Sequence, residues 1–144
     1  MNDPYNLQRF IDAQSPVYPL VCSELRKGYK TSHWMWFVFP QIRGLGYSAM
    51  AKKFAISSLE EARAYLDHSI LGNRLRECAQ LVYQIEGRTI QQIFGSPDDL
   101  KFASSMTLFA MATSDNLDFE AALQKYFAGK YDQLTVELLS RADD

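Results

Sequence analysis

The residues whose types and spacing could support chemistry begin at one aromatic stretch, residues 31–46. It contains both tryptophans of the chain and one of its two histidines, and polar side chains flank its apolar run. His33 directly precedes the run, Lys30 lies three residues earlier, and Gln41 follows the run. A histidine that is partly desolvated by aromatic rings can titrate near neutral pH and act as an acid or a base. We therefore predict that His33 is catalytic; the alternative is a core histidine whose ring nitrogens bond to backbone carbonyls.

A second polar group lies in the segment 97–112, which is otherwise mostly apolar. Lys101, Ser104 and Ser105 recur at three- and four-residue steps, so on a helix they project from one face. Buried hydroxyls and a buried ammonium need hydrogen-bond partners. A ligand could supply these partners, as could protein carbonyls and Asp98. The alternative is that the serines allow close helix packing while the lysine ammonium reaches solvent.

Arg74 stands near the start of a long apolar repeat and forms the third group. A guanidinium binds a carboxylate or phosphate through two parallel hydrogen bonds, so Arg74 is a candidate anion clamp. It is equally a candidate salt-bridge partner of Asp67, Glu77 or Asp98. The second histidine, His68, falls near a predicted helix C-terminus, where a protonated imidazole is favourable, and we interpret it as a structural cap.

Motifs for metals and cofactors are missing from the sequence. The two histidines and two cysteines show no ligand spacing such as H-x-x-x-H or C-x-x-C. There is no P-loop and no G-x-G-x-x-G, so we expect no cofactor. Cys22 and Cys78 lie far apart within apolar helical patterns, and no basic-then-apolar leader follows Met1. We interpret both as reduced, buried thiols of a cytoplasmic protein.

Composition and charge limit the class of protein. A chain of 144 residues that is 47% hydrophobic and 22% charged fits one globular domain, residues 1–144. Its longest unbroken apolar run, residues 34–39, is far shorter than the roughly 18 residues that a membrane-spanning helix needs. The net charge is −2, yet residues 25–59 carry six basic and no acidic side chains. Six cations are few for a nucleic-acid footprint, and the acidic remainder would repel a long polyanion.

Helical patterns must position these residues. Apolar side chains recur at three- and four-residue steps in several segments, most regularly in 71–85, which we predict to be the longest helix. Ser58 and Thr89 open capping boxes, and Ser96 followed by proline is a further start signal. Short connections and no alternating strand pattern predict an all-α domain of about eight or nine helices around the buried aromatic segment.

The aromatic run itself fits a buried strand or a buried helix equally well by periodicity alone. We predict a helix, because Thr31 or Ser32 can cap its amino end, Pro40 stops it, and no nearby segment offers a strand to pair with.

The chain resembles an uncharacterised bacterial family of small α-helical proteins, some of which are labelled calpastatin. The resemblance spans nearly the whole sequence and is carried by the segments at 30–41 (with HWMWFVFPQ), 44–46, 71–75, 94–98 and 101–109. It departs at position 103, often basic in the family and alanine here, and at position 69, often proline and serine here. The resemblance implies a single, mainly helical domain and brings no established activity.

The polar residues selected above coincide with signature positions of that family, which favours one pocket over scattered structural roles. Cations among aromatic side chains favour a small phosphorylated, carboxylated or nucleotide-like ligand whose ring stacks on tryptophan. The predicted ligand-binding residues are Lys30, Trp34, Trp36, Gln41, Arg74, Asp98, Lys101, Ser104 and Ser105. The alternative is a protein-interaction module without catalysis, in which the aromatic side chains extend to an exposed patch.

Overall fold

The helix that organises the fold is α8 (Asp98–Ala112), which is apolar on nearly every face. Every residue from Phe102 to Ala110 is buried in the computed structural model, which describes residues 2–142. A helix that is hydrophobic all round must be covered on all sides. Helices α5, α7, α9 and α10 all pack against α8.

Ten helices form within the described residues, and the prediction of an all-α fold is confirmed. The sequence predicted about eight or nine helices; three of those found, α3, α4 and α7, have only four or five residues. The helices are α1 (Gln8–Gln14), α2 (Tyr18–Lys27), α3 (Met35–Val38), α4 (Ala49–Lys53), α5 (Leu59–Asp67), α6 (Leu71–Tyr83), α7 (Ile90–Phe94), α8, α9 (Leu117–Phe127) and α10 (Gln133–Ala142).

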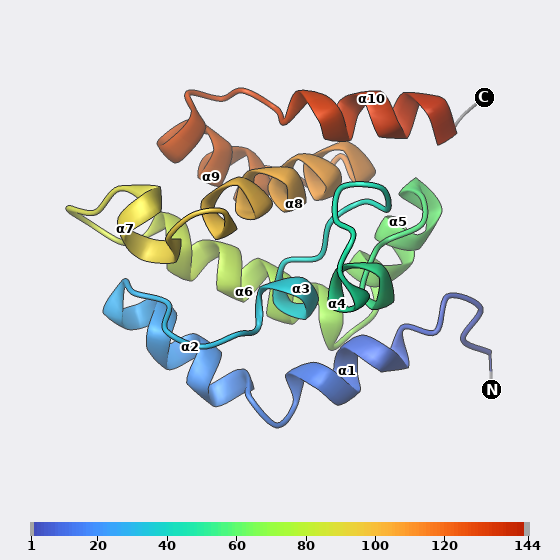
Figure 1. Cartoon of the computed structure of the whole chain (residues 1–144), viewed down its shortest axis with the longest axis horizontal. Helices are drawn as coiled ribbons and strands as arrows, with labels where there is room; N and C mark the ends of the chain where they lie inside the picture. The colour runs from blue at the N-terminus through green and yellow to red at the C-terminus, as the bar shows by residue number, and fades with distance from the viewer. Residues whose placement is uncertain (1, 143–144) are drawn as a thin grey trace.

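The helices are arranged as layers across the molecule (Figure 1). α10 lies along one side, α8 and α9 come next, and α1 and α2 lie along the opposite side. α6 connects the layers, because it packs against α2, α5 and α9. The short helices α3 and α4 occupy the face nearest the viewer in Figure 1, joined by a long loop. The buried side chains form one continuous apolar cluster, so the described chain has a single core.

The aromatic stretch joins this core, but the helix that we predicted between a Thr31 or Ser32 cap and Pro40 forms only in part. Only the single turn α3 is helical, and Trp34 rather than Thr31 or Ser32 precedes it. The buried Glu24 carboxylate accepts hydrogen bonds from the Thr31 amide (2.8 Å), the Ser32 amide (3.1 Å), the Ser32 hydroxyl (2.6 Å) and the Trp34 indole (3.0 Å). These donors are therefore held by Glu24 of α2. In the predicted helix, the Thr31 or Ser32 hydroxyl would instead have accepted a hydrogen bond from an amide of its own first turn.

Predictions from local signals mostly hold at the helix ends. Gly28 ends α2 in the left-handed conformation (φ 78°), and Thr89 opens α7 with a complete capping box. The cap predicted for His68 is different in kind: its Nδ1 accepts from the amides of Ile70 (3.1 Å) and Leu71 (3.3 Å), so it caps the start of α6 and not the end of α5. The longest helix is α8, not α6. None of the helices within residues 2–142 is long and apolar enough to cross a membrane.

Candidate functional site

A carboxylate near the start of α8 gathers two of the predicted cations. The Lys30 ammonium lies 2.9 Å from one Asp98 oxygen, and the Lys101 ammonium lies 3.5 Å from the other. Lys30 is 5.0 Å from the ring centre of Trp34, and Lys101 is 5.4 Å from that of Trp36. The structure thus brings five predicted residues together. Two cations against one carboxylate leave an excess of positive charge beside the Trp36 ring.

The Trp34 ring lies in the core and is 1% exposed, so it offers no face on which a ligand could stack. Its indole donates to Glu24, and its ring contacts those of Phe39 and Phe94 at 6.2 and 6.5 Å between centroids. Trp36 is only partly buried, and its ring lies beside the Lys101 ammonium. Of the two tryptophans, Trp36 is therefore the one that can meet a ligand.

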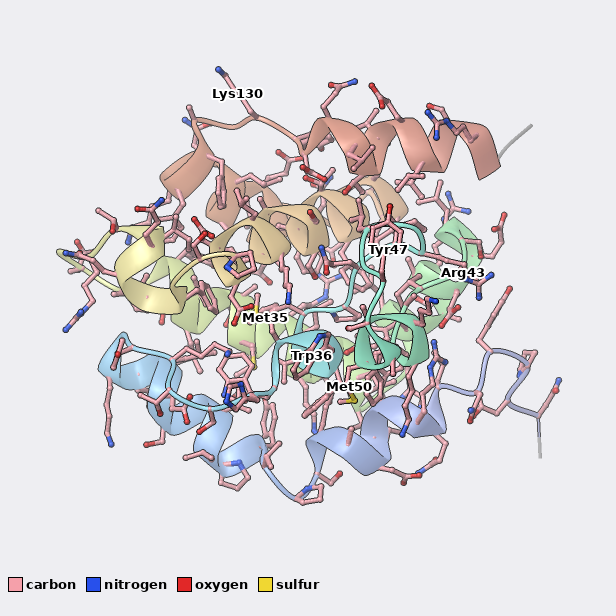
Figure 2. The ribbon with its side chains drawn as sticks, viewed as in Figure 1. Met35, Trp36, Arg43, Tyr47, Met50 and Lys130 are labelled. Carbon is pink, nitrogen blue, oxygen red and sulfur yellow. The ribbon has the colours of Figure 1, made fainter. Side chains whose placement is uncertain are left out.

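A hollow of about 410 Å³ lies beside Trp36, within the size range of small-molecule sites. Its walls are aromatic or apolar over much of their area, and two cationic side chains, Arg43 and Lys52, lie among them without any carboxylate. The lining residues are Trp36, Gln41, Ile42, Arg43, Gly44, Gly46, Tyr47, Ala51, Lys52, Phe54 and Ala55. Figure 2 shows Trp36, Arg43, Tyr47 and Met50 on one side of the molecule, where α3 and α4 meet the loop between them.

The segment 42–56 forms most of this hollow, and its two ends are tied together. An isolated parallel bridge joins Ile42 to Ile56, through hydrogen bonds from the Arg43 amide to the Ile56 carbonyl (2.8 Å) and from the Ile56 amide to the Gln41 carbonyl (2.9 Å). The bridge sets Gln41 and Arg43 at the mouth of a closed loop. It therefore explains how two cations nine positions apart in sequence come to line one hollow.

The loop closes tightly upon itself. Within the loop, Ser48 caps α4 by accepting from the Ala51 amide (3.1 Å). Gly46 lies so close to Ala51 that a Cβ at position 46 would sit 2.6 Å from the Ala51 Cβ. Gly44 adopts φ 106°, a conformation that side-chain-bearing residues rarely adopt. These two glycines allow the chain to turn back toward Trp36.

Arg74 belongs to another part of the molecule. Its guanidinium lies 3.4 Å from the Gln14 amide oxygen, 3.3 Å from the Ser15 hydroxyl and 4.9 Å from the ring centre of Tyr18. It therefore holds the junction of α1 and α2 against α6. It is not among the residues that line the hollow or contact Asp98, so the structure does not unite it with Lys101 as predicted.

The two serines of α8 point into protein. The Ser104 hydroxyl is shared between the Leu100 carbonyl and the Asp132 carboxylate, both at 3.1 Å, and so ties α8 to the start of α10. The Ser105 hydroxyl is fully buried and has no hydrogen-bond partner among the described residues. Neither serine lines the hollow.

His33 is exposed, and within residues 2–142 its imidazole makes no hydrogen bond or salt bridge. It does not line the hollow. Among the described residues, no group of three His, Cys, Asp or Glu side chains is placed to hold a metal ion. The hollow beside Trp36 therefore has an aromatic wall and two basic lining residues, and no histidine, cysteine or carboxylate lines it.

Sequence reasoning identified Trp36 and Gln41 of the hollow but did not select Arg43, Tyr47, Lys52 or Phe54 as site residues. The signal that could have found the cations was the run of basic residues without acidic ones in 25–59. That run alone does not reveal the Ile42–Ile56 bridge, a contact between positions that are distant in the sequence.

Comparison with known proteins gives a relative of the same fold. The chain is 61% identical to a solved structure described as the conserved hypothetical protein Rv1873 from Mycobacterium tuberculosis. The match covers 96% of this chain and 99% of the other, with a TM-score of 0.95. No curated protein matches the sequence. The family model described as "Protein of unknown function (DUF1810)" matches residues 4–139, nearly the full length. The chain therefore belongs to this family of proteins of unknown function.

Proposed function

We propose that the protein binds a small anionic molecule, phosphorylated or carboxylated, in the hollow between α3 and the segment 42–56. The observation that carries this proposal is the lining: two cationic side chains and no carboxylate in a hollow with aromatic walls. Two basic residues among the lining residues, with no carboxylate among them, favour an anion there. The Lys101 ammonium beside Trp36 adds to the positive potential.

The walls favour a ligand that also carries a ring or an apolar group. Trp36, Tyr47 and Phe54 provide aromatic surface, and Gln41 provides an amide that can orient a polar substituent. Pockets that bind small molecules combine mostly apolar walls with a few placed polar groups, as this one does. An aryl phosphate, an aryl carboxylate or a nucleotide has the required combination of ring and charge.

The proposal is tested with compounds that separate the two features. We expect adenosine monophosphate or phenyl phosphate to raise the melting temperature more than inorganic phosphate or uncharged adenosine, because a ligand that binds only the native state stabilises it. Calorimetric titration at 25 °C should then show weaker binding in Arg43→Gln and Lys52→Gln. Trp36→Leu should weaken binding of the aromatic compounds while leaving that of inorganic phosphate unchanged.

Lys130→Gln is the matched control, because Lys130 is an exposed lysine at the turn between α9 and α10, away from α3 and α4 (Figure 2). It should bind as the wild type does. Equal responses to charged and uncharged compounds, or equal losses in Lys130→Gln and Lys52→Gln, would contradict the proposal. Tyr47 is 84% exposed and Met50 is 36% exposed at the same face. If no small anion binds, these two side chains become the first positions to substitute in a search for a protein partner.

A further inference from the structure

Two thiols that the proposed ligand site does not use lie together where α2 meets α6. Cys22 on α2 is 4% exposed and Cys78 on α6 is fully buried. The Cys22 sulfur lies 3.7 Å from a Glu77 carboxylate oxygen, and the Cys78 sulfur lies 3.8 Å from the Tyr18 hydroxyl. The Tyr18 hydroxyl in turn donates to the same Glu77 oxygen at 2.5 Å. Both sulfurs thus contact one phenol–carboxylate pair.

We propose that Cys22 and Cys78 are a redox-active dithiol, which a small hydroperoxide oxidises to a disulfide joining α2 to α6. The two helices pack directly against each other, and the two sulfurs lie 3.7 and 3.8 Å from the hydrogen-bonded Glu77 carboxylate and Tyr18 hydroxyl. The sequence holds only these two cysteines, so no other thiol competes for the bond. Neither cysteine lines the hollow beside Trp36, and this inference is independent of the proposed ligand.

Cys22 is the thiol suited to react first. It is the more exposed of the two, and the Cys78 side chain beside it lowers its pKa to about 7 against the opposing effects of burial and of the Glu77 charge. The same contact and its burial raise the pKa of Cys78. This lowering of the pKa favours the Cys22 thiolate, the form that attacks peroxides. Cys78 keeps its proton until the second step.

The proposed reaction balances with the hydroperoxide as the only oxidant. The Cys22 thiolate attacks one peroxide oxygen, the O–O bond breaks, and hydroxide (or alkoxide) leaves, which gives a sulfenic acid on Cys22. The Cys78 sulfur then attacks the Cys22 sulfur, the S–S bond forms and the S–O bond breaks. The departing hydroxide takes up a proton and becomes water. Two electrons pass from the two thiols to the peroxide.

Tyr18 and Glu77 are positioning residues for the second step. The Cys78 thiol contacts the Tyr18 hydroxyl, which donates to Glu77, an exposed side chain on α6. This chain of hydrogen bonds leads from the buried thiol to solvent. It offers the Cys78 proton a path outward as the sulfur attacks.

The test treats the reduced full-length protein with a stoichiometric amount of hydrogen peroxide and follows its intact mass. We expect the loss of two hydrogen atoms, reversal by dithiothreitol, and a peptide pair that links Cys22 to Cys78 after digestion at low pH. The cross-linked protein should melt several degrees higher, because the bond closes a long loop in the unfolded chain. Cys78→Ala should stop at a sulfenic acid on Cys22 that dimedone traps, while Tyr18→Phe should slow cross-linking more than it slows peroxide consumption.

Several results would overturn the proposal, and the wild type alone can provide them. They are a disulfide only between two molecules, sulfinic acid on Cys22 without a cross-link, or unchanged mass under excess peroxide. A cross-link that forms as fast in guanidinium-unfolded protein as in native protein would also overturn it, because the native helices would then contribute nothing. These measurements remain decisive even where a substituted variant does not fold.

Discussion

At the scale of single residues, the buried Glu24 fixes the start of the aromatic stretch by accepting hydrogen bonds from Thr31, Ser32 and Trp34. Burial alone would raise its pKa, but hydrogen bonds from Ser32, Thr31 and Trp34 outweigh burial and lower the pKa to about 2. A carboxylate with a lowered folded-state pKa stabilises the protein above its unfolded pKa, and that stabilisation is lost as pH falls through the folded value. For Glu24 the window runs from about pH 4.5 down to about 2.

We expect Glu24→Gln to lower the free energy of unfolding at neutral pH by about 2–4 kcal/mol, because a neutral amide replaces a charged acceptor of four donors. Its stability should also fall less than that of the wild type between pH 4.5 and 2. Urea unfolding at a series of pH values measures both effects. Glu137→Gln, a change of an exposed residue on α10, is the control and should follow the wild type. Parallel pH profiles for wild type and Glu24→Gln would refute this role.

At the scale of elements, the loop that forms the hollow depends on a clamp from α1. The Arg9 guanidinium donates to the carbonyls of Lys53 (2.8 Å) and Ala55 (2.9 Å) and to the carboxylate of buried Glu61 (3.0 Å). The same Glu61 accepts from the amide and hydroxyl of Ser57. Arg9 thereby holds the end of α4 and the start of α5 against α1.

We expect Arg9→Met to destabilise the protein by about 2–4 kcal/mol, since it leaves four carbonyls and a buried carboxylate without their charged donor. Within the molecule the effect should concentrate on the segment 42–56, where the amides of Arg43 and Ile56 should exchange with deuterium faster than the global loss of stability predicts. Arg141→Met, on an exposed arginine of α10, is the control. Exchange accelerated equally in every helix would show that Arg9 acts on global stability alone.

The contact between α5 and α6 requires a glycine for space. A Cβ at Gly72 would lie 2.1 Å from the Leu66 carbonyl oxygen, a backbone atom that cannot move aside easily. Alanine would gain about 1 kcal/mol in helix propensity, but the overlap should reverse this gain and give a net loss of about 2–4 kcal/mol. Gly87→Ala meets no atom within 4 Å and carries only the strain of its positive φ. Chemical unfolding should rank Gly72→Ala well below Gly87→Ala in stability; the reverse order would mean that α5 and α6 can separate without cost.

At the scale of the whole molecule, local signals in the sequence predicted the elements better than their contacts. Gly28 and Thr89 mark helix ends through hydrogen bonds within a few residues, as predicted. Ser58 caps α5, but the capping box predicted there is incomplete, because the Glu61 carboxylate accepts from the Ser57 amide instead of the Ser58 amide. Arg74 was grouped with Lys101 from residue type and from the family resemblance, but the direction of its side chain depends on how α6 packs against α1 and α2. Contacts between distant segments decide where such a side chain points. The pattern of residues along one segment does not reveal those contacts.

The distribution of charge over the whole chain favours the binding of small anions over the binding of long polyanions. Residues 25–59 carry six basic side chains, while the chain as a whole has a net charge of −2. A duplex that contacts the basic segment also meets the acidic remainder, and its binding depends on the release of counterions. We expect any binding to a 30-base-pair duplex at low salt to vanish by about 150 mM salt. In the proposed site adenosine monophosphate meets the cations of Arg43 and Lys52 and no carboxylate, so we expect it still to bind at that concentration. Fluorescence anisotropy with labelled duplex, beside calorimetry with the nucleotide, makes the comparison. Duplex binding that persists at this salt and is lost in Arg43→Gln would instead identify the hollow as part of a nucleic-acid interface.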